Sequence, residues 1–378
     1  MKITAYQAIC NLGNNIDEIY KKAIEGDTSC FDNLEGYLSE GFVRFGLIKT
    51  QLPEIRNEKY NIRCNKIILK NLQLLEKEIS NLKAKYKNDR IGIVVATTNS
   101  GVEEYETTNN PLHFELGNPV CFLRETLETK GFYTTVSTAC SSGLKAFSLA
   151  RDLLNNNISD AVVVVTIDTI SKVSIYGFSS LEVVSNEPCL PFSKNRKGMN
   201  LAEGSAIFII EKDSKEGIDI MGLGENSDVY HSTTPDPSGK EAVNAINEAL
   251  KDAGIEIKDI DYINVHGTGT IANDIMETNA IKKIFLTHNP PASSTKQMTG
   301  HCLGAAAGIE TALCCKLIDS FDGRMYPHIY DENYDDSLPQ INLVKKNEKY
   351  EKCNICMCNS FGFGGTNAIM IVGKNHGK

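Results

Sequence analysis

The sequence predicts an α/β protein built from two halves of similar design. Apolar segments of strand length alternate with amphipathic segments of helix length, which favours sheets covered by helices on both faces. Several predicted strands run into turns of small residues, and a helix follows each turn. The same pattern recurs in the second part of the chain, which indicates a duplicated fold without readable sequence identity. A polar stretch at 211–219 is the best candidate for the seam, so we expect halves at 1–212 and 213–378.

In the first half, apolar runs predict strands at 1–10, 90–96, 132–136, 160–165 and 206–210. The strand at 160–165 has no polar alternation, as expected in a parallel sheet covered on both faces. Asn15 is placed to cap a helix that starts at Ile16. Residues 62–86 read as one long amphipathic helix, because apolar residues recur at spacings of four and three.

The second half repeats this order of elements. An amphipathic pattern predicts a helix over 239–253, and a small-residue-rich segment predicts another over 304–317. The predicted strands are 262–266, 352–359 and 368–372. Two of these three strands end in glycine-containing turns, at the same place in the pattern as the most distinctive turn of the first half.

The composition excludes several classes of protein. The 378 residues are 41% hydrophobic and 23% charged, which is ordinary for a globular chain. A net charge of −9 argues against a broad nucleic-acid-binding surface. No apolar run is long enough to span a membrane, and the N-terminal residues lack a signal-peptide pattern. The 12 scattered cysteines read as reduced thiols, so we expect a cytoplasmic protein.

The turn around Cys140 is the first candidate for a catalytic site. It joins the strand at 132–136 to a helix, and small residues surround the cysteine. A cysteine at a helix N-terminus meets free N–H groups and the positive end of the helix dipole, and both favour the thiolate. The same N–H groups can receive the oxyanion of a thioester intermediate. A buried, purely structural cysteine is the alternative interpretation.

Three later turns carry residues that suit the same chemistry. They contain His266, the pair Lys296 and His301, and the glycine-rich run 362–367. Residues at the carboxyl ends of strands in an open α/β sheet gather around one crevice. A cysteine, two histidines and a lysine that converge there would suit acyl transfer through a thioester.

Together the four turns resemble the β-ketoacyl-acyl-carrier-protein synthases, the decarboxylating condensing enzymes of the thiolase superfamily. The matching segments are Thr138–Gly143, Asn264–Thr270, Lys296–His301 and Asn359–Asn367. The resemblance covers nearly the whole chain and implies a thiolase-like fold, with mixed sheets and helices in an α/β/α/β/α arrangement. One cysteine with two histidines is the pattern of the elongating synthases. The details look closer to synthases of specialised pathways, such as aryl polyene clusters, than to those of housekeeping fatty acid biosynthesis.

The resemblance also implies roles at the reacting centre. Cys140 would carry the acyl group, and His266 and His301 would donate hydrogen bonds to the enolate that forms when malonyl thioester loses CO2. The backbone N–H groups of Cys140 and Phe363 would hold the oxyanion, and the Phe363 ring would gate the acyl pocket. Lys296 is expected to pair with a glutamate and so to orient the histidines.

The remaining expectations concern support, substrate and partners. Glu203 is the expected partner of Lys296, and Thr268 and Thr270 would bind the pantetheine arm. We expect no resident cofactor or metal, because the substrates arrive on the phosphopantetheine of acyl carrier protein. Cys353, Cys356 and Cys358 include a C-x-x-C pair, but three thiols within one strand make a poor zinc site. The candidate residues for docking the acidic carrier protein are Arg63, Lys66, Lys194, Arg196 and Lys197.

Two other functions compete with the condensing enzyme. The chain could be a non-catalytic ketosynthase-like subunit that shapes the pocket of a catalytic partner, or a hydrolase that cleaves thioesters with Cys140 and one histidine. The intact cysteine and histidines argue against the first, and the second histidine with Lys296 argues against the second. A homodimer and a ketosynthase heterodimer both agree with the sequence.

Overall fold

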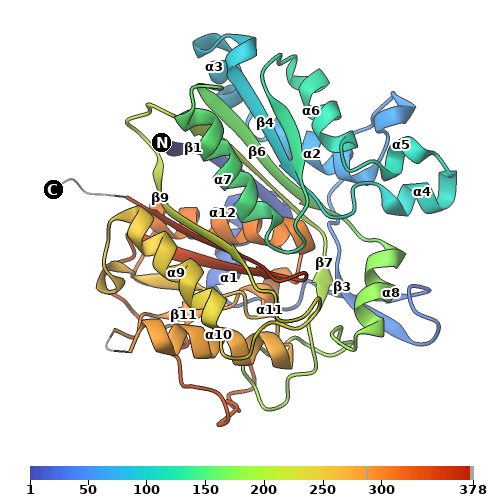
Figure 1. The fold of residues 1–378 in the computed structure, drawn as a ribbon. Helices are drawn as coiled ribbons and strands as arrows, with labels where there is room; N and C mark the ends of the chain where they lie inside the picture. Colours follow the sequence, from blue (N-terminus) through green and yellow to red (C-terminus); the bar gives the residue numbers. More distant parts are fainter. Residues whose placement is uncertain (287, 375–378) are drawn as a thin grey trace.

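Ten strands form the frame of the protein in the computed structural model, which describes residues 1–286 and 288–374 (Figure 1). In the first half the spatial order is β1 (Lys2–Cys10), β8 (Gly204–Glu211), β6 (Ala161–Asp168), β4 (Ile91–Ala96), β5 (Tyr133–Val136). In the second half it is β9 (Ile218–Ser227), β13 (Thr366–Gly373), β12 (Ile355–Gly362), β10 (Tyr262–Asn264), β11 (Ala292–Ser293). The halves join where β1 and β9 pair through Lys2 and Ile3.

The two halves have the same strand directions, which confirms the duplicated design. The strands β4 and β10 each lie parallel to both of their neighbours. The other pairs in both halves, β6–β8, β8–β1, β12–β13 and β13–β9, are antiparallel. The sheets are therefore mixed. The strand at 160–165 was expected in a purely parallel sheet, which was wrong, because β6 is parallel to β4 but antiparallel to β8. The boundary predicted at 212 and 213 lies in the turn between β8 and β9, and as a domain boundary it remains a prediction.

Helices complete five layers. The first sheet is covered outside by α2 (Arg63–Gln73) and α6 (Asn118–Leu127), and the second sheet by α9 (Lys240–Ala253) and α10 (Ile271–Ile284). Between the sheets lie α7 (Ser142–Asn155) and α12 (Ala306–Asp319), with α1 (Ile16–Ile24) beside them (Figure 1). Asn15 caps α1 as predicted, accepting a hydrogen bond from the Glu18 N–H at 2.9 Å. The layered thiolase-like arrangement is confirmed.

Shorter elements surround these layers. They are a small sheet of β2 (Asp32–Glu35), β3 (Phe42–Gly46) and β7 (Leu201–Ala202), and the helices α3 (Glu76–Lys85), α4 (Val102–Thr108), α5 (Pro111–Phe114), α8 (Lys172–Ser180) and α11 (Lys296–Thr299). The segment 101–131 folds as three short helices, α4 to α6. Within the described residues, no helix combines the length and the apolar character needed to cross a membrane.

The predicted helix at 62–86 and the unpredicted strand β9 each have a physical explanation. The helix predicted over 62–86 is two helices, because α2 ends at Gln73 and α3 starts at Glu76. The strand β9 was not predicted, since glycines interrupt its apolar pattern. A Cβ atom at Gly222 or Gly224 would lie only 2.2 or 2.0 Å from a carbonyl oxygen of α9. These glycines are therefore required for α9 to pack closely on the strand, and tertiary packing overrides their low strand propensity.

Candidate active site

The turn after β5 presents Cys140 at the start of α7. Ala139 has a φ of +54°, a left-handed conformation that is uncommon for a residue with a side chain. The hydroxyl of Ser360 on β12 donates to the Cys140 carbonyl at 2.8 Å, so the second half holds the nucleophile turn of the first. A Cβ atom at Gly362 would lie 3.0 Å from the Thr138 carbonyl and 3.3 Å from the Cys140 nitrogen. Only glycine allows this close approach of the two turns without displacement.

The structure brings Cys140, His266 and His301 together. The Cys140 sulfur lies 3.1 Å from His301 Nε2, and one ligand-type atom from each of the three residues lies within 4.8 Å of the others. The two imidazole rings are nearly perpendicular, with centroids 5.4 Å apart. Of the two imidazoles, that of His301 lies within hydrogen-bonding distance of the sulfur, so it is the group placed to exchange a proton with Cys140.

Burial keeps both histidines neutral. It lowers the pKa of His266 well below the ordinary value, and the charge of Lys296 and the neighbouring His301 lower it further. Burial and the Lys296 charge act in the same direction on the pKa of His301. Neutral imidazoles can donate a hydrogen bond to a developing oxyanion without transferring the proton outright.

The environment of Cys140 differs from the sequence expectation. Burial raises the pKa of the Cys140 thiol to about 11, although the charge of Lys296 and the backbone N–H groups of Phe363 and Cys140 lower it in part. The expected preference for thiolate in the free protein was therefore wrong, because the sulfur is almost fully buried. The thiol has to lose its proton during the reaction, and His301 is in place to accept it.

Lys296 has a different partner from the one predicted. Its ammonium lies 3.5 Å from His266 Nδ1 and forms an ion pair with Glu310 on α12. Glu203 instead forms a two-point ion pair with Arg63, at 2.6 and 2.7 Å, and accepts the Ile48 N–H. The predicted pair between Lys296 and Glu203 was wrong, and Glu203 supports the loops around β3 rather than the histidines.

Removing the Lys296 charge is expected to change the pH dependence of the reaction. In Lys296→Met the pKa of both histidines should rise, because the ammonium no longer opposes their protonation. A cationic His301 cannot accept the Cys140 proton. Burial still lowers both pKa values in the variant, and even at the ordinary histidine pKa of about 6.5 roughly a quarter of His301 is neutral at pH 6. We therefore expect condensation at pH 6 to fall by up to about fourfold relative to pH 8, whereas the unaltered protein should show little change over that range. The measurement is the rate of product formation against pH.

Two further variants control this experiment. Lys296→Met with Glu310→Gln leaves no unpaired buried carboxylate, so it separates the loss of the ammonium from destabilisation by an isolated charge. Lys316→Met removes a lysine of α12 that pairs with Asp17 at the surface, and should keep the pH profile of the unaltered protein. An equal loss of activity at every pH would contradict the role given to the Lys296 charge.

The glycine turn between β12 and β13 contributes to the site through its backbone. The backbone N–H groups of Phe363 and Cys140 both lower the pKa of the Cys140 thiol, so they face its sulfur. These two N–H groups can hold the oxyanion of an acyl group attached at the sulfur. The Phe363 ring packs against Phe178 of α8 with centroids 5.5 Å apart, so a movement of the ring would open or close the space between them.

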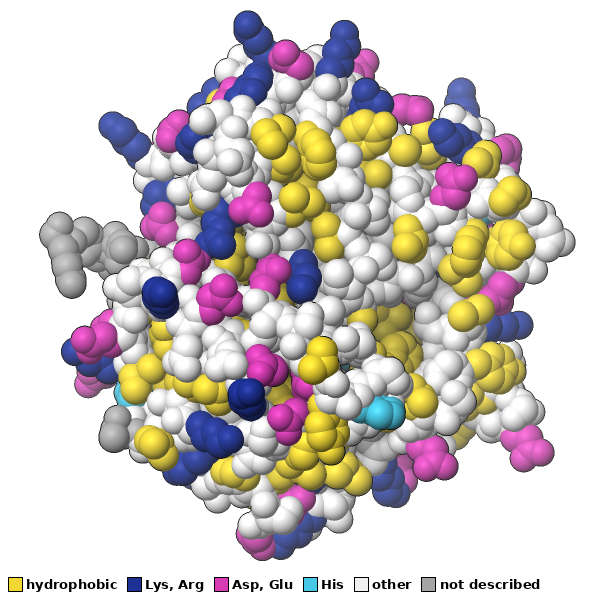
Figure 2. Space-filling model, in the orientation of Figure 1, with side chains coloured by type: hydrophobic (Ala, Val, Ile, Leu, Met, Phe, Trp, Pro, Cys, Tyr) yellow, Lys and Arg dark blue, Asp and Glu magenta, His cyan; other side chains and the backbone are white. Residues whose placement is uncertain are grey.

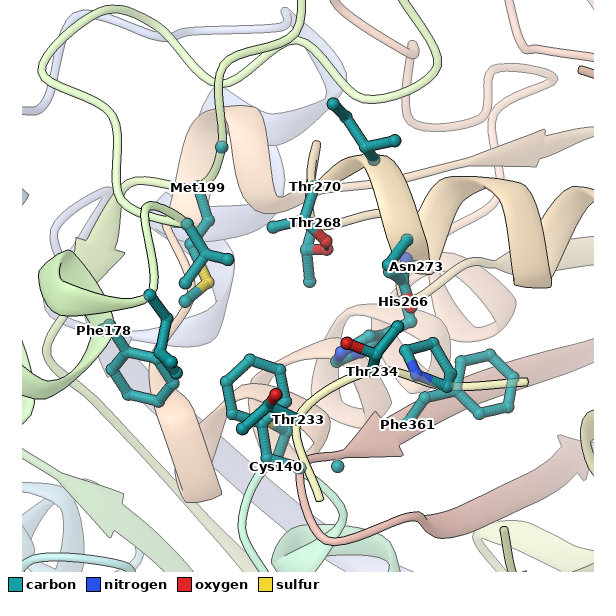
Figure 3. A pocket seen from close by; sticks show the side chains of 18 of the residues that line it. Cys140, Phe178, Met199, Thr233, Thr234, His266, Thr268, Thr270, Asn273 and Phe361 are labelled. Carbon is teal, nitrogen blue, oxygen red and sulfur yellow. Dashed lines mark hydrogen bonds between the residues drawn. The ribbon is translucent and has the colours of Figure 1, made fainter. Parts of the chain in front are cut away.

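A cavity of about 320 Å³ leads from the surface to the three converging residues. Figure 2 shows one face of the molecule hollowed, with hydrophobic side chains on the walls of the hollow. Figure 3 shows Cys140 and His266 in this cavity together with Thr268 and Thr270. The two threonine hydroxyls lie 2.9 Å apart. Both hydroxyls are placed to form hydrogen bonds with a polar chain that enters the cavity.

The predicted docking residues fall into two groups. Arg63 and Arg196 are engaged inside the protein, Arg63 with Glu203 and Arg196 with acidic side chains at 2.7 and 3.5 Å. Their charges are already paired with carboxylates of this chain, which leaves them less available to a carrier protein, and their role in docking stays a prediction. The others, Lys66, Lys194 and Lys197, reach the surface, and each forms an exposed or partly exposed ion pair. Lys197 also lines the cavity.

Three buried carboxylates support the site and were missed in the sequence. Glu310 pairs with Lys296, and Glu277 of α10 accepts the N–H groups of His266 and Gly267 at 2.7 and 2.8 Å. Asp168 at the end of β6 accepts the Gly304 N–H, just after His301. Burying a carboxylate is unfavourable unless it is paired, so an acidic residue within the small-residue-rich helix predicted over 304–317 is the signal that could have revealed Glu310.

The converging residues include atoms that also ligate metals. Among the described residues, Cys140, His266 and His301 form the group whose ligand atoms come closest together. The ammonium of Lys296 lies next to this group, and a positive charge at that distance opposes a divalent cation. The three residues therefore fit acyl transfer better than metal binding.

Comparison with solved structures agrees with this geometry. One chain of the complex between the ketosynthase ApeO and its chain length factor ApeC from Xenorhabdus doucetiae has a TM-score of 0.93 and 34% sequence identity. The match covers 98% of this chain and 97% of that one. A β-ketoacyl synthase from Burkholderia phymatum STM815, with a TM-score of 0.88 and 20% identity, shares the fold.

Sequence comparisons lead to the same family. A 3-oxoacyl-[acyl-carrier-protein] synthase 2 of Staphylococcus aureus (strain N315) is 29% identical over 98% of this chain and 97% of its own length. The enzyme of that name from Coxiella burnetii (strain RSA 493 / Nine Mile phase I) is 35% identical over 65% of this chain and 63% of its own length. The profiles of the beta-ketoacyl synthase N-terminal and C-terminal domains match residues 78–216 and 219–321, more than half of the chain. The chain therefore belongs to the β-ketoacyl synthase family and is an enzyme of the acyltransferase type.

Proposed function

We propose that this enzyme catalyses a decarboxylative Claisen condensation between an acyl thioester and malonyl-acyl carrier protein. The observation that carries the proposal is the meeting of the Cys140 sulfur with His301 Nε2 at 3.1 Å and with His266 close by. A hydrolase needs a nucleophile and one base. Two neutral imidazoles beside a lysine are better matched to stabilising an enolate.

In the first step Cys140 takes the acyl group. His301 accepts the thiol proton, and the sulfur attacks the carbonyl carbon of the acyl thioester. The negative charge on the carbonyl oxygen is stabilised by the N–H groups of Cys140 and Phe363. The carrier thiol leaves with a proton, and the acyl group remains on Cys140.

In the second step malonyl thioester enters the same cavity. Loss of CO2 places negative charge on the thioester oxygen, to which His266 and His301 donate hydrogen bonds. The resulting carbanion attacks the acyl-Cys140 carbonyl and releases the sulfur. The Lys296 charge favours the neutral form of both imidazoles in this step, after the carrier thiol has left with the proton, and Glu310 balances the lysine charge in the protein interior.

The test is product analysis with acyl- and malonyl-loaded carrier protein. We expect a β-ketoacyl product with one CO2 per turnover, and mass spectrometry should detect acyl-Cys140 before malonyl is added. Release of a free acid instead would favour the thioester hydrolase. A chain that neither accepts an acyl group nor releases CO2 would favour the accessory subunit.

We also propose that the enzyme needs no resident cofactor or metal. Its substrates would arrive on a phosphopantetheine arm, which fits a cavity that is narrow, partly apolar and lined by Thr268 and Thr270. All the proton transfers in the proposed mechanism are assigned to side chains of this chain. Activity should therefore survive dialysis against a metal chelator.

Carrier docking is proposed on Lys197, which lines the cavity, and on Lys194, which lies three residues before it in the same loop. Reversing both charges, Lys194→Glu with Lys197→Glu, is expected to raise KM for malonyl-carrier protein by about tenfold, since a rim charge acts mainly on encounter with an oppositely charged partner. KM for a malonyl thioester of a small thiol should stay unchanged. Lys258→Glu, at an exposed pair with Glu256, is the matched control. Equal effects on both substrates would contradict docking.

We propose that the β5 edge binds a second chain of the ketosynthase fold. The strand β5 ends the strand order of the sheet, and Phe132 and Tyr133 are 42% and 39% exposed there. An exposed strand edge with aromatic residues is a template for pairing with another chain. The similarity to a chain of the ApeO–ApeC complex supports a ketosynthase partner and a pathway of the aryl polyene or polyketide type.

Sedimentation analysis tests this surface. The unaltered protein, alone or expressed with a chain length factor-like partner, should sediment as a dimer, and Phe132→Glu should shift it towards monomer. A dimer that forms only with the second chain would identify a heterodimer, whereas a dimer of this chain alone would identify a homodimer. An unchanged dimer in Phe132→Glu would contradict the assignment of this edge.

A further inference from the structure

Four cysteines outside the reacting centre form a buried row between β12 and α12. Cys353 lies just before β12, Cys356 and Cys358 lie on that strand, and Cys314 lies on α12. All four are free thiols that are at most 2% exposed. The proposed condensation uses none of them.

The thiols of this row contact one another. The sulfurs of Cys353 and Cys356 are 3.5 Å apart. Hydrogen bonds from the Cys356 and Cys358 thiols also lower the pKa of the Cys314 thiol. The row therefore runs from Cys353 through Cys356 to Cys314 and Cys358.

The turn that carries Cys353 and Cys356 is held in place by Asp261. One carboxylate oxygen of Asp261 accepts the N–H groups of Asn354 and Ile355, at 2.8 and 3.1 Å. The other pairs with the Lys352 ammonium at 2.9 Å. These contacts fix the backbone between Cys353 and Cys356, so their two sulfurs meet without a rearrangement of the strand.

Cys353 lies at the outer end of the buried row and is 2% exposed. Its preceding neighbours Glu351 and Lys352 are exposed, whereas Cys356 is completely buried. A small neutral oxidant can reach a nearly buried thiol at such an edge more easily than a bulky disulfide can. Hydrogen peroxide is an oxidant of this kind.

We propose that Cys353 and Cys356 are a redox-active dithiol that hydrogen peroxide converts into an intrachain disulfide. The Cys353 sulfur attacks one peroxide oxygen, the O–O bond breaks, water leaves, and Cys353 becomes a sulfenic acid. The Cys356 sulfur then attacks the Cys353 sulfur, the S–O bond breaks, and a second water leaves. The two thiols thus lose two electrons and two protons, and peroxide is reduced to water.

Peptide mapping of the full-length reduced protein tests this proposal. After a brief exposure to peroxide and alkylation under denaturing conditions, the tryptic peptide 353–374 should lack two hydrogen atoms and carry one alkyl group, on Cys358. Treatment with dithiothreitol before alkylation should restore three alkylated cysteines. Cys353→Ser should abolish the disulfide, and Cys315→Ser, which alters an adjacent thiol of α12, should leave it intact.

Two results would overturn the assignment. One is a peptide 353–374 that keeps three alkylated cysteines at a peroxide dose that oxidises most of Cys140. The other is a disulfide that joins Cys314 to β12 in place of the predicted pair. Circular dichroism of Cys353→Ser checks that the variant is folded, so that a missing disulfide reports the missing thiol.

Discussion

Replacing Cys140 with alanine is expected to eliminate β-ketoacyl product while CO2 release from malonyl thioester continues. The condensation needs an acyl group on the sulfur, so we expect a loss of about 10⁴-fold or more in product formation, similar to removal of other covalent nucleophiles. Decarboxylation depends instead on the donors at His266 and His301, which the substitution leaves in place. The two rates are measured in one reaction, as product by mass spectrometry and as CO2 from labelled malonyl.

The matched control is Cys64→Ala, which removes another buried thiol. That thiol contacts the Ser100 carbonyl rather than the cavity, so both rates should stay near those of the unaltered protein apart from a loss of stability. Parallel loss of product and CO2 in Cys140→Ala would show that the sulfur takes part in decarboxylation, and would contradict the separation of the two steps.

Replacing each of the two histidines by alanine is expected to slow different steps of the reaction. His301→Ala should slow both acyl transfer to Cys140 and decarboxylation, because His301 Nε2 lies 3.1 Å from the sulfur and is placed to accept its proton. His266→Ala should slow decarboxylation and leave acyl transfer nearly unchanged. Each lost proton acceptor or oxyanion donor is expected to cost about 10²–10⁴-fold in the affected step. Single-turnover acylation and CO2 release measure the two steps separately.

His328→Ala is the control for loss of a buried imidazole. His328 contacts the Pro191 carbonyl and the Ser294 N–H instead of Cys140. The variant His328→Ala should lower the stability of the protein, but it should not slow one of the two steps more than the other. Equal effects of His266→Ala and His301→Ala on acyl transfer would argue that the proton of Cys140 leaves by a route other than His301.

The protonation states of Cys140 and His301 depend on their burial, which the sequence pattern did not reveal. The helix N-terminus at Cys140 led us to expect a thiolate, yet burial raises the pKa of the thiol to about 11. The same burial lowers the pKa of His301 and so leaves a neutral base beside the sulfur. The free enzyme is thus expected to hold a thiol and an imidazole, with proton transfer coupled to attack on the substrate.

The sequence by itself was enough to predict the duplicated α/β design and the four turns that supply the site. These features depend on local periodicity and on residue types placed at strand ends, both of which lie within short windows of the chain. The motifs were also long enough to identify the family before any spatial information. The prediction of one long helix at 62–86 failed, because a break of two residues does not disturb the periodic pattern.

Only the tertiary structure decided which charged residues pair and which remain available to a partner. Lys296 pairs with Glu310, and Glu203 with Arg63, in place of the predicted pairing of Lys296 with Glu203. Arg63 and Arg196 are likewise neutralised inside the protein. The reason is physical: the energy of a buried charge depends on partners and solvent exposure set by contacts between segments far apart in the chain, and those contacts leave no periodic trace in the sequence.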